Sequence, residues 1–176
     1  QDDKKIIIDL CRYERIFQKD LKGPAGDSPS QLARWTVNPE TRNVSEEIVS
    51  DLPHEFPAHD PRVVGRRHRY AYTALGFDLG PTYRTDMETG EVIFHDHGEG
   101  RFGGEPIFVP REGSTNEEDG WILVCVNDRG GSPAELVILE ANNIEGKPIA
   151  RIHLPQRVPD GFHGAWVPDT VVSPYE

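Results

Sequence analysis

Apolar positions along the chain gather in short runs, separated by connections rich in glycine and proline. The chain has 17 Gly and 15 Pro, which are spread between the runs. Several runs alternate polar and apolar positions, as strands with one buried face do, and no long window keeps the period and end signals of an amphipathic helix. The pattern therefore predicts an all-β fold. The predicted strands are Lys5–Leu10, Gln31–Val37, Tyr70–Ala74, Thr82–Asp86, Val92–Phe94, Pro106–Pro110, Trp121–Asn127, Glu135–Glu140 and Pro148–His153.

Connections of hairpin type join several of these runs. Asn38–Asn43, Asp86–Gly90 and Asn142–Gly146 contain the Asn, Asp and Gly residues that tight turns favour. Ser45–Ser50 is compatible with one helical turn or, better, with the edge of a strand. A four-stranded propeller blade takes about 40–45 residues, so a chain of this length would supply about three or four blades, which is too few for a propeller closed by this chain alone. A β-sandwich remains the alternative architecture.

The composition restricts the classes of protein to consider. The mean hydropathy of −0.58 indicates a soluble chain, and no apolar run approaches the roughly 18 residues that span a membrane. The formal net charge of −11 disfavours a nucleic-acid partner, because phosphate contacts need clustered Lys and Arg. One basic cluster, Arg62–Arg69, is expected to pair with the acidic surface.

The two cysteines, Cys11 and Cys125, show neither a disulfide framework nor a metal-binding spacing. Their scarcity favours a reducing, cytoplasmic location. The first residues, Gln1–Leu10, resemble a polar turn entering a strand and show no secretory signal. We therefore expect this chain to begin inside a larger fold.

Three segments contain side chains suited to a metal site. His163 stands between Gly161 and Gly164, where a tightly turned backbone can bring an imidazole close to a ligand. Glu105 precedes an apolar strand and Glu55 precedes Phe-Pro, and a carboxylate in such a place needs a hydrogen-bonding partner. A metal-bound imidazole needs such an acceptor for its second nitrogen. The alternative is two carboxylates in surface turns and a structural histidine.

His95 and His97 form another pair that suggests metal binding, because alternate residues of a strand share one face. Their surroundings are acidic and resemble a loop, so we expect both imidazoles to be solvated.

Taken together, the segments resemble the C-terminal part of the carotenoid cleavage oxygenase family, which includes stilbene-cleaving dioxygenases and retinoid isomerohydrolases. The similar segments follow the family's order across about Gln31–Val167. They are Ala33–Trp35, Glu55–Pro57, Arg69–Tyr72, Gly104–Arg111, Glu117–Leu123, Ile149–Ala150 and Leu154–Gly164. The resemblance implies a seven-bladed β-propeller, of which residues 1–176 would be the C-terminal part of one domain, with the upstream blades outside this chain.

The resemblance also implies a site. In the family, ferrous iron lies on the propeller axis, bound by four histidines, and glutamates orient three of them. His163 matches the last of the four, Glu105 the glutamate that orients it, and Glu55 the glutamate that orients the third. Phe162 is a candidate for the wall of the substrate cavity. The three other histidines would come from the remaining propeller segment, which is thus an expected partner.

The reaction implied by the resemblance is oxidative cleavage of a conjugated C=C bond by a non-haem Fe(II) dioxygenase. Dioxygen and a hydrophobic conjugated small molecule would be the substrates, and two aldehydes the products. The segment Pro53–Tyr70 is more similar to the lignostilbene- and resveratrol-cleaving branch, so we expect a stilbenoid substrate. Carotenoid or apocarotenoid cleavage by the same chemistry, the redox-neutral isomerohydrolase reaction and a non-catalytic β-propeller binding module are the alternatives.

Overall fold

A computed structural model describes residues 5–18, 27–75, 80–159 and 163–169 of the chain. These residues form antiparallel β-sheets with two short 3₁₀ turns, η1 (Pro61–Val63) and η2 (Ala141–Asn143). The prediction of an all-β chain is confirmed. The described residues contain no helix long and apolar enough to cross a membrane.

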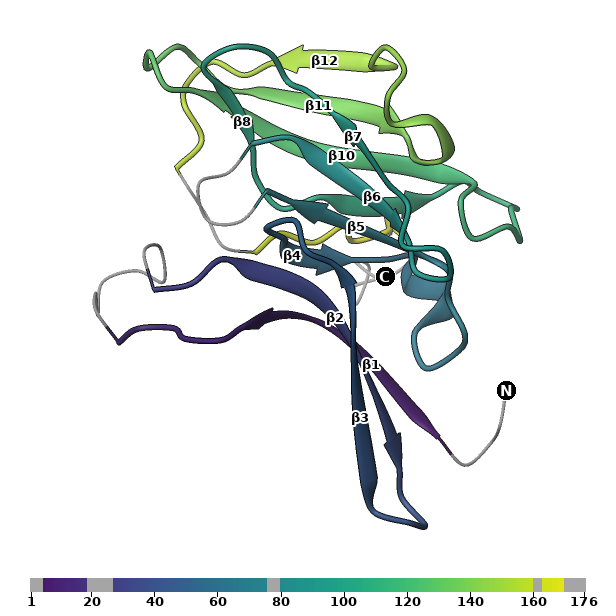
Figure 1. The fold of residues 1–176 in the computed structure, drawn as a ribbon. Helices are drawn as coiled ribbons and strands as arrows, with labels where there is room; N and C mark the ends of the chain where they lie inside the picture. The colour runs from purple at the N-terminus through teal and green to yellow at the C-terminus, as the bar shows by residue number, and fades with distance from the viewer. Residues whose placement is uncertain (1–4, 19–26, 76–79, 160–162, 170–176) are drawn as a thin grey trace, which may run out of the picture.

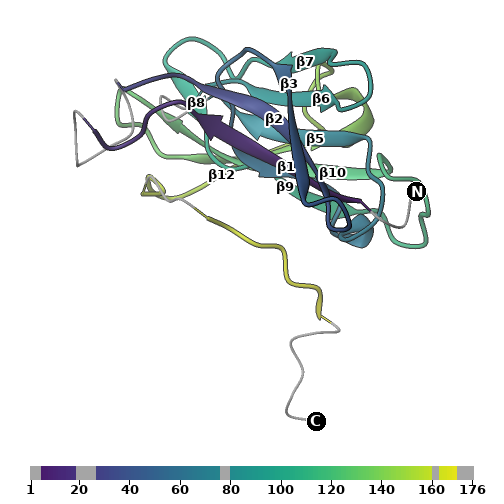
Figure 2. The same cartoon turned by 60° about the horizontal axis from the view of Figure 1, so that its bottom comes forward.

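The strands form three sheets, stacked in chain order in Figure 1, and Figure 2 turns the first of them toward the viewer. The first contains β1 (Ile6–Tyr13), β2 (Ser30–Asn38) and β3 (Asn43–Ser50). The second contains β4 (Glu55–Ala58), β5 (Tyr70–Ala74), β6 (Thr82–Asp86) and β7 (Val92–His95). The third contains β8 (Arg101–Gly103), β9 (Ile107–Pro110), β10 (Gly120–Asp128), β11 (Glu135–Glu140) and β12 (Ala150–His153).

Within each sheet, strands that follow one another along the chain are mostly neighbours in space. The exception is β10. Along one of its edges it pairs with β8 near Val126 and with β9 near Ile122. The turn after β6 shows why the hairpins form: Gly90 has a φ of 75° and donates its N–H to the Asp86 carbonyl at 2.8 Å. A left-handed residue of this kind costs glycine little.

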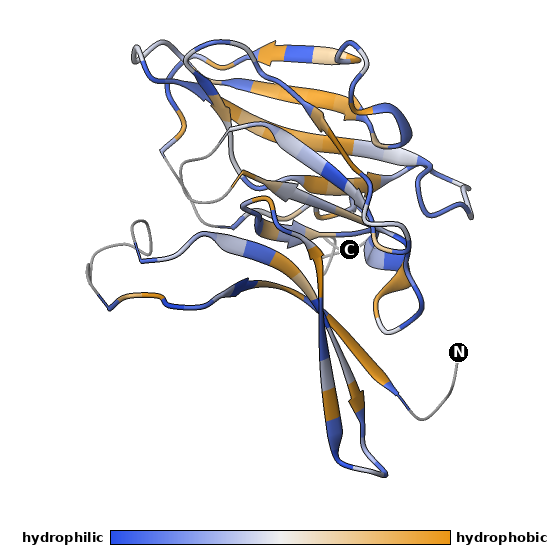
Figure 3. Cartoon of the chain, in the orientation of Figure 1, coloured by the Kyte–Doolittle hydropathy of each residue, from blue (hydrophilic) through white to orange (hydrophobic). Residues whose placement is uncertain are grey.

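The main core lies between the second and third sheets. Alternate residues of β10 and β11 point inward, and Figure 3 shows both strands as largely hydrophobic. From the second sheet, Tyr72 enters this core and donates its hydroxyl to the Ala141 carbonyl at 3.2 Å. The buried cluster is Tyr72, Phe108, Ile122, Val124, Val126, Val137, Leu139, Ala141 and Ile144. A smaller cluster of Leu32, Ala71 and Met87 joins the first two sheets.

All nine predicted strands are present, with small shifts at their ends. The strand interpretation of Ser45–Ser50 is also correct, because these residues lie in β3. Sequence reasoning missed two short strands, β4 and β8. β4 contains Pro57, and its Phe56 has a φ of 53°, so no regular strand pattern marks it.

The expectation that His95 and His97 are solvated is wrong. Both imidazoles are buried beside each other, with ring centroids 5.1 Å apart. His95 Nδ1 donates to the Ile144 carbonyl at 2.9 Å, and His97 Nε2 lies 3.0 Å from Thr82 Oγ1. Thr82 lies in β6 and Ile144 follows η2, and the local sequence around the two histidines reveals neither partner.

Ion pairs account for much of the basic cluster, as expected. Arg62 binds Asp60, Arg67 binds Glu88, and Arg69 binds Asp86. These three arginines are therefore paired with carboxylates within the fold.

Candidate functional site

Glu55 is the first residue of β4, at an edge of the second sheet, and it lies close to the end of β1 in the first sheet. The Tyr13 hydroxyl donates a hydrogen bond to Glu55 Oε1. The following N–H, from Phe56, donates to Glu55 Oε2 at 3.2 Å. The carboxylate thus joins two sheets and is held at both oxygens.

Phe56 connects Glu55 with the chain near His163. Its backbone is left-handed, and its ring is only 6% exposed. The ring edge faces the His163 imidazole, with centroids 6.0 Å apart and planes at 85°. Such an edge-to-face contact is a favourable geometry for aromatic rings and limits how far the imidazole can rotate.

Glu105 lies just before β9 and contacts the segment after β12. Its Oε1 is 3.3 Å from His163 Nδ1, and its Oε2 accepts the N–H of Gly164 at 2.5 Å. One carboxylate therefore holds both the imidazole and the backbone that follows it, across 58 residues of sequence. Glycine suits this position, since a Cβ on Gly164 would lie 2.8 Å from Ile107 Cδ1.

The contact with Glu105 decides which nitrogen of His163 can bind a ligand. An ionised carboxylate only accepts, so the hydrogen lies on Nδ1 and the lone pair on Nε2. The His163 side chain is 80% exposed, and no described residue partners Nε2. The lone pair of Nε2 therefore points away from Glu105 and is suited to bind a metal ion from the solvent-exposed side of the ring.

The described residues provide two histidines of this kind, because His153 is 79% exposed and also has its Nδ1 beside a glutamate, Glu135, at 3.1 Å. They contain no group of three or more His, Cys, Asp or Glu side chains placed to bind a metal ion. His54, His68 and His97 bind Ser50, Asp9 and Thr82 respectively. Phe162, the predicted cavity residue, lies outside the described residues. A metal at His163 would therefore need ligands from beyond these segments.

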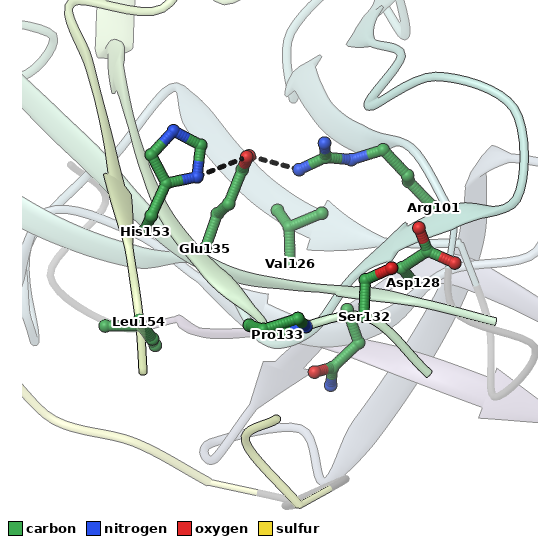
Figure 4. Close-up of a pocket in the computed structure, with 9 residues that line it drawn as sticks. Arg101, Val126, Asp128, Ser132, Pro133, Glu135, His153 and Leu154 are labelled. Carbon is green, nitrogen blue, oxygen red and sulfur yellow. Dashed lines mark hydrogen bonds and ion pairs between the residues drawn. The ribbon is translucent and has the colours of Figure 1, made fainter. Parts of the chain in front are cut away.

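A separate polar hollow of about 390 Å³ lies on the third sheet. Figure 4 shows its Glu135 carboxylate between His153 and Arg101. Arg151 also binds Glu135, at 3.1 Å. The hydrogen bond from Arg101 lowers the pKa of Glu135, and the carboxylate is already neutralised. The two arginines hold the Glu135 carboxylate in ion pairs, so this cluster ties β8, β11 and β12 together.

Phe56 offers a direct test of how the site is supported. We expect Phe56→Ala to destabilise the protein by about 3–5 kcal/mol, because it leaves a cavity where a buried ring was. Phe94→Ala, at a half-exposed ring of β7, serves as the control and should cost far less. Thermal unfolding of both variants measures the difference. Equal, small losses would show that Phe56 does not support the site.

Antiparallel sheets of neighbouring strands that follow one another along the chain are the arrangement of blades in a β-propeller. The model of the family described as retinal pigment epithelial membrane protein matches residues 1–168. The chain belongs to this family, that of the carotenoid cleavage oxygenases.

Two curated relatives illustrate the similarity. A carotenoid cleavage oxygenase of Mycobacterium tuberculosis is 39% identical over 175 residues, which cover 94% of this chain and 34% of that protein. The apocarotenoid-15,15'-oxygenase of Synechocystis is 33% identical over 178 residues, covering 94% and 36%. This chain thus spans about a third of the length of the relatives that it matches.

The solved structures give the same result. Cobalt-substituted Synechocystis apocarotenoid oxygenase superposes with a TM-score of 0.85 at 32% identity, over 95% of this chain and 37% of that one. The family's structures are seven-bladed propellers, so the predicted propeller blades are confirmed and the sandwich alternative is excluded. The expectation of the stilbene-cleaving branch finds no support in these relatives, which are named for carotenoids and apocarotenoids.

Proposed function

We propose that the protein containing this chain is a non-haem Fe(II) dioxygenase that cleaves a conjugated C=C bond of a carotenoid or apocarotenoid with O2. Two aldehydes or ketones are the products. The observation that carries the proposal is the Glu105 carboxylate, which holds His163 Nδ1 and leaves Nε2 free. The names of the similar proteins support the substrate class.

Residues 1–176 are then the C-terminal part of a single propeller domain. His163 is the ligand that this part supplies, and the other three histidines come from the remaining blades. This division agrees with the finding that the described residues contain no group of three or more side chains placed to bind a metal ion. It also agrees with the third of the relatives' length that the chain spans.

The residues of this chain have simple roles in the reaction. His163 would bind the iron through Nε2 as a neutral ligand, with Glu105 keeping the hydrogen on Nδ1. Glu55 would accept the hydrogen of a second imidazole, supplied by an upstream blade. Four neutral imidazoles would add no negative charge to the iron and would leave coordination positions open for O2. When bound, ferrous iron supplies the activation of O2.

Product analysis on the complete protein tests this function. The protein is purified without chelator, its iron content is measured, and it is incubated with an apocarotenal under ¹⁸O₂. We expect about one iron per protein and two carbonyl products. Each product should carry one labelled oxygen, provided that exchange with water is kept slow.

A stilbenoid incubated in parallel separates the alternatives. Cleavage of the stilbenoid alone would show that the substrate class is wrong and would restore the earlier expectation. A protein that binds no iron and cleaves neither compound would contradict the proposal and favour a non-catalytic module.

A further inference from the structure

Tyr13 is the one residue of the first sheet whose described hydrogen bond reaches a candidate site carboxylate. It ends β1, and its hydroxyl donates to Glu55 Oε1 at the start of β4, 42 residues later. This bond therefore crosses from an edge strand of the first sheet to an edge strand of the second. Nothing in the sequence pattern singles out Tyr13, because its partner is remote.

The tyrosine is suited to remain a donor. Burial, with the hydrogen bond to Glu55, raises the pKa of Tyr13 above its ordinary value. Nearby, burial and the Glu55 charge raise the pKa of the Cys11 thiol to about 12. Both groups therefore stay protonated near neutral pH, and Glu55 has a fixed donor beside it rather than a second negative charge.

The two bonds to Glu55 fix the plane of its carboxylate. Oε1 receives the Tyr13 hydroxyl, and Oε2 receives the Phe56 N–H at 3.2 Å. Each carboxylate oxygen can accept more than one hydrogen bond, so capacity remains for an imidazole N–H. The phenol thus limits the directions from which that imidazole can approach.

We propose that Tyr13 is a positioning residue for the metal site. It orients the Glu55 carboxylate, and through Glu55 it orients a histidine ligand supplied by an upstream blade. This inference rests on the proposed function, in which Glu55 accepts from such a histidine. Removing the hydroxyl frees the carboxylate to rotate and weakens the imidazole's hold on iron without removing any ligand.

The test is Tyr13→Phe in the complete, iron-loaded protein. Losing a partner of this kind in a metal site typically costs 10–100-fold in metal affinity or activity. Because Tyr13 acts through Glu55, we expect about tenfold faster loss of iron to a chelator. We also expect kcat to fall with little change in KM, since the substrate cavity is untouched.

Tyr72→Phe is the matched control, because it removes one tyrosine hydroxyl bond, to the Ala141 carbonyl, within the core between sheets. It should leave iron release and kcat unchanged. A double-mutant cycle completes the design: in a Glu55→Gln background, Tyr13→Phe should have little further effect, since both act through one carboxylate.

Three results would overturn the inference. Tyr13→Phe could release iron as slowly as Tyr72→Phe while its melting temperature falls. This result would mean that the bond between Tyr13 and Glu55 only holds the two sheets together. The Tyr13 and Glu55 effects could be additive, which means independent roles. A wild-type protein that binds no iron would overturn the proposed function and this inference with it. The iron content of the wild-type protein is therefore measured before any variant is made.

Discussion

His163→Ala in the complete protein should abolish iron binding and C=C cleavage together. The substitution removes the imidazole whose Nε2 is left free by the Glu105 contact, while the fold keeps its core, because His163 is 80% exposed. We expect iron affinity to fall by at least about 100-fold, the upper range for losing even an indirect partner of a ligand. Iron analysis and turnover measure the effect.

His153→Ala is the matched control for this experiment. Its imidazole is similarly exposed, at 79%, and also contacts a glutamate, Glu135, at 3.1 Å. Its loss should leave iron and activity unchanged. Normal iron content and turnover in His163→Ala would refute the assignment of His163 as a ligand.

The second large effect is a loss of stability in mild acid. His54 is 0% exposed between Thr73 and Ser50, and His97 is 4% exposed. Burial lowers the pKa of His54 to about 4 and that of His97 to about 3. Burial also lowers the pKa of His59 and His95.

The sign follows from comparing the folded and unfolded chains. An unfolded histidine has a pKa of about 6.5, so it gains a proton below that pH while the buried one stays neutral. Stability is therefore full above about pH 6.5 and falls as the pH drops toward the folded values. At pH 5, His54 and His97 should each cost about 2 kcal/mol, a large part of a typical total of about 5–15 kcal/mol.

The ion pairs of Asp86 and Asp9 do not change the stability between pH 6.5 and pH 5. The hydrogen bond from Arg69 lowers the pKa of Asp86 to about 2. Burial alone would raise the pKa of Asp9, but bonds from Arg34 and His68 outweigh it and bring it to about 2. These two ion pairs persist to about pH 4, so they do not contribute between pH 6.5 and 5.

Denaturant unfolding at several pH values tests the prediction. His97→Gln keeps a group that can bond Thr82 Oγ1 and should flatten the loss of stability between pH 7 and 5, as should His54→Gln. A slope that stays the same in both glutamine variants would show that the buried imidazoles are not its cause.

The sequence supports the strands better than it supports the site. The hydrophobic periodicity and the turn residues predict nine of the twelve described strands, because nearby residues decide where each of these strands lies. The sequence does not predict β4, because Pro57 and the left-handed Phe56 interrupt the regular alternation of a strand. The contact of Glu105 with His163 agrees with the motifs, although a separation of 58 residues could not be read from spacing alone.

Other parts of the site depend on contacts that no local pattern contains. Tyr13 closes an apolar run and looks like a strand residue, yet its partner, Glu55, is 42 positions away. His95 and His97 flank an aspartate and look solvated, yet the surrounding strands bury them. In each case the partner is set by how the sheets pack, which follows from the whole fold.

The bond between Glu105 and the segment after β12 also has a consequence for biosynthesis. The ribosome makes His163 after every strand of the three described sheets, and domains generally fold as their sequence emerges. Glu55 and Glu105 can thus reach their places before His163 has been synthesised. The bonds from His163 and Gly164 to Glu105 therefore form only after the three sheets have been made, and they attach the segment after β12 to strands that are already in place.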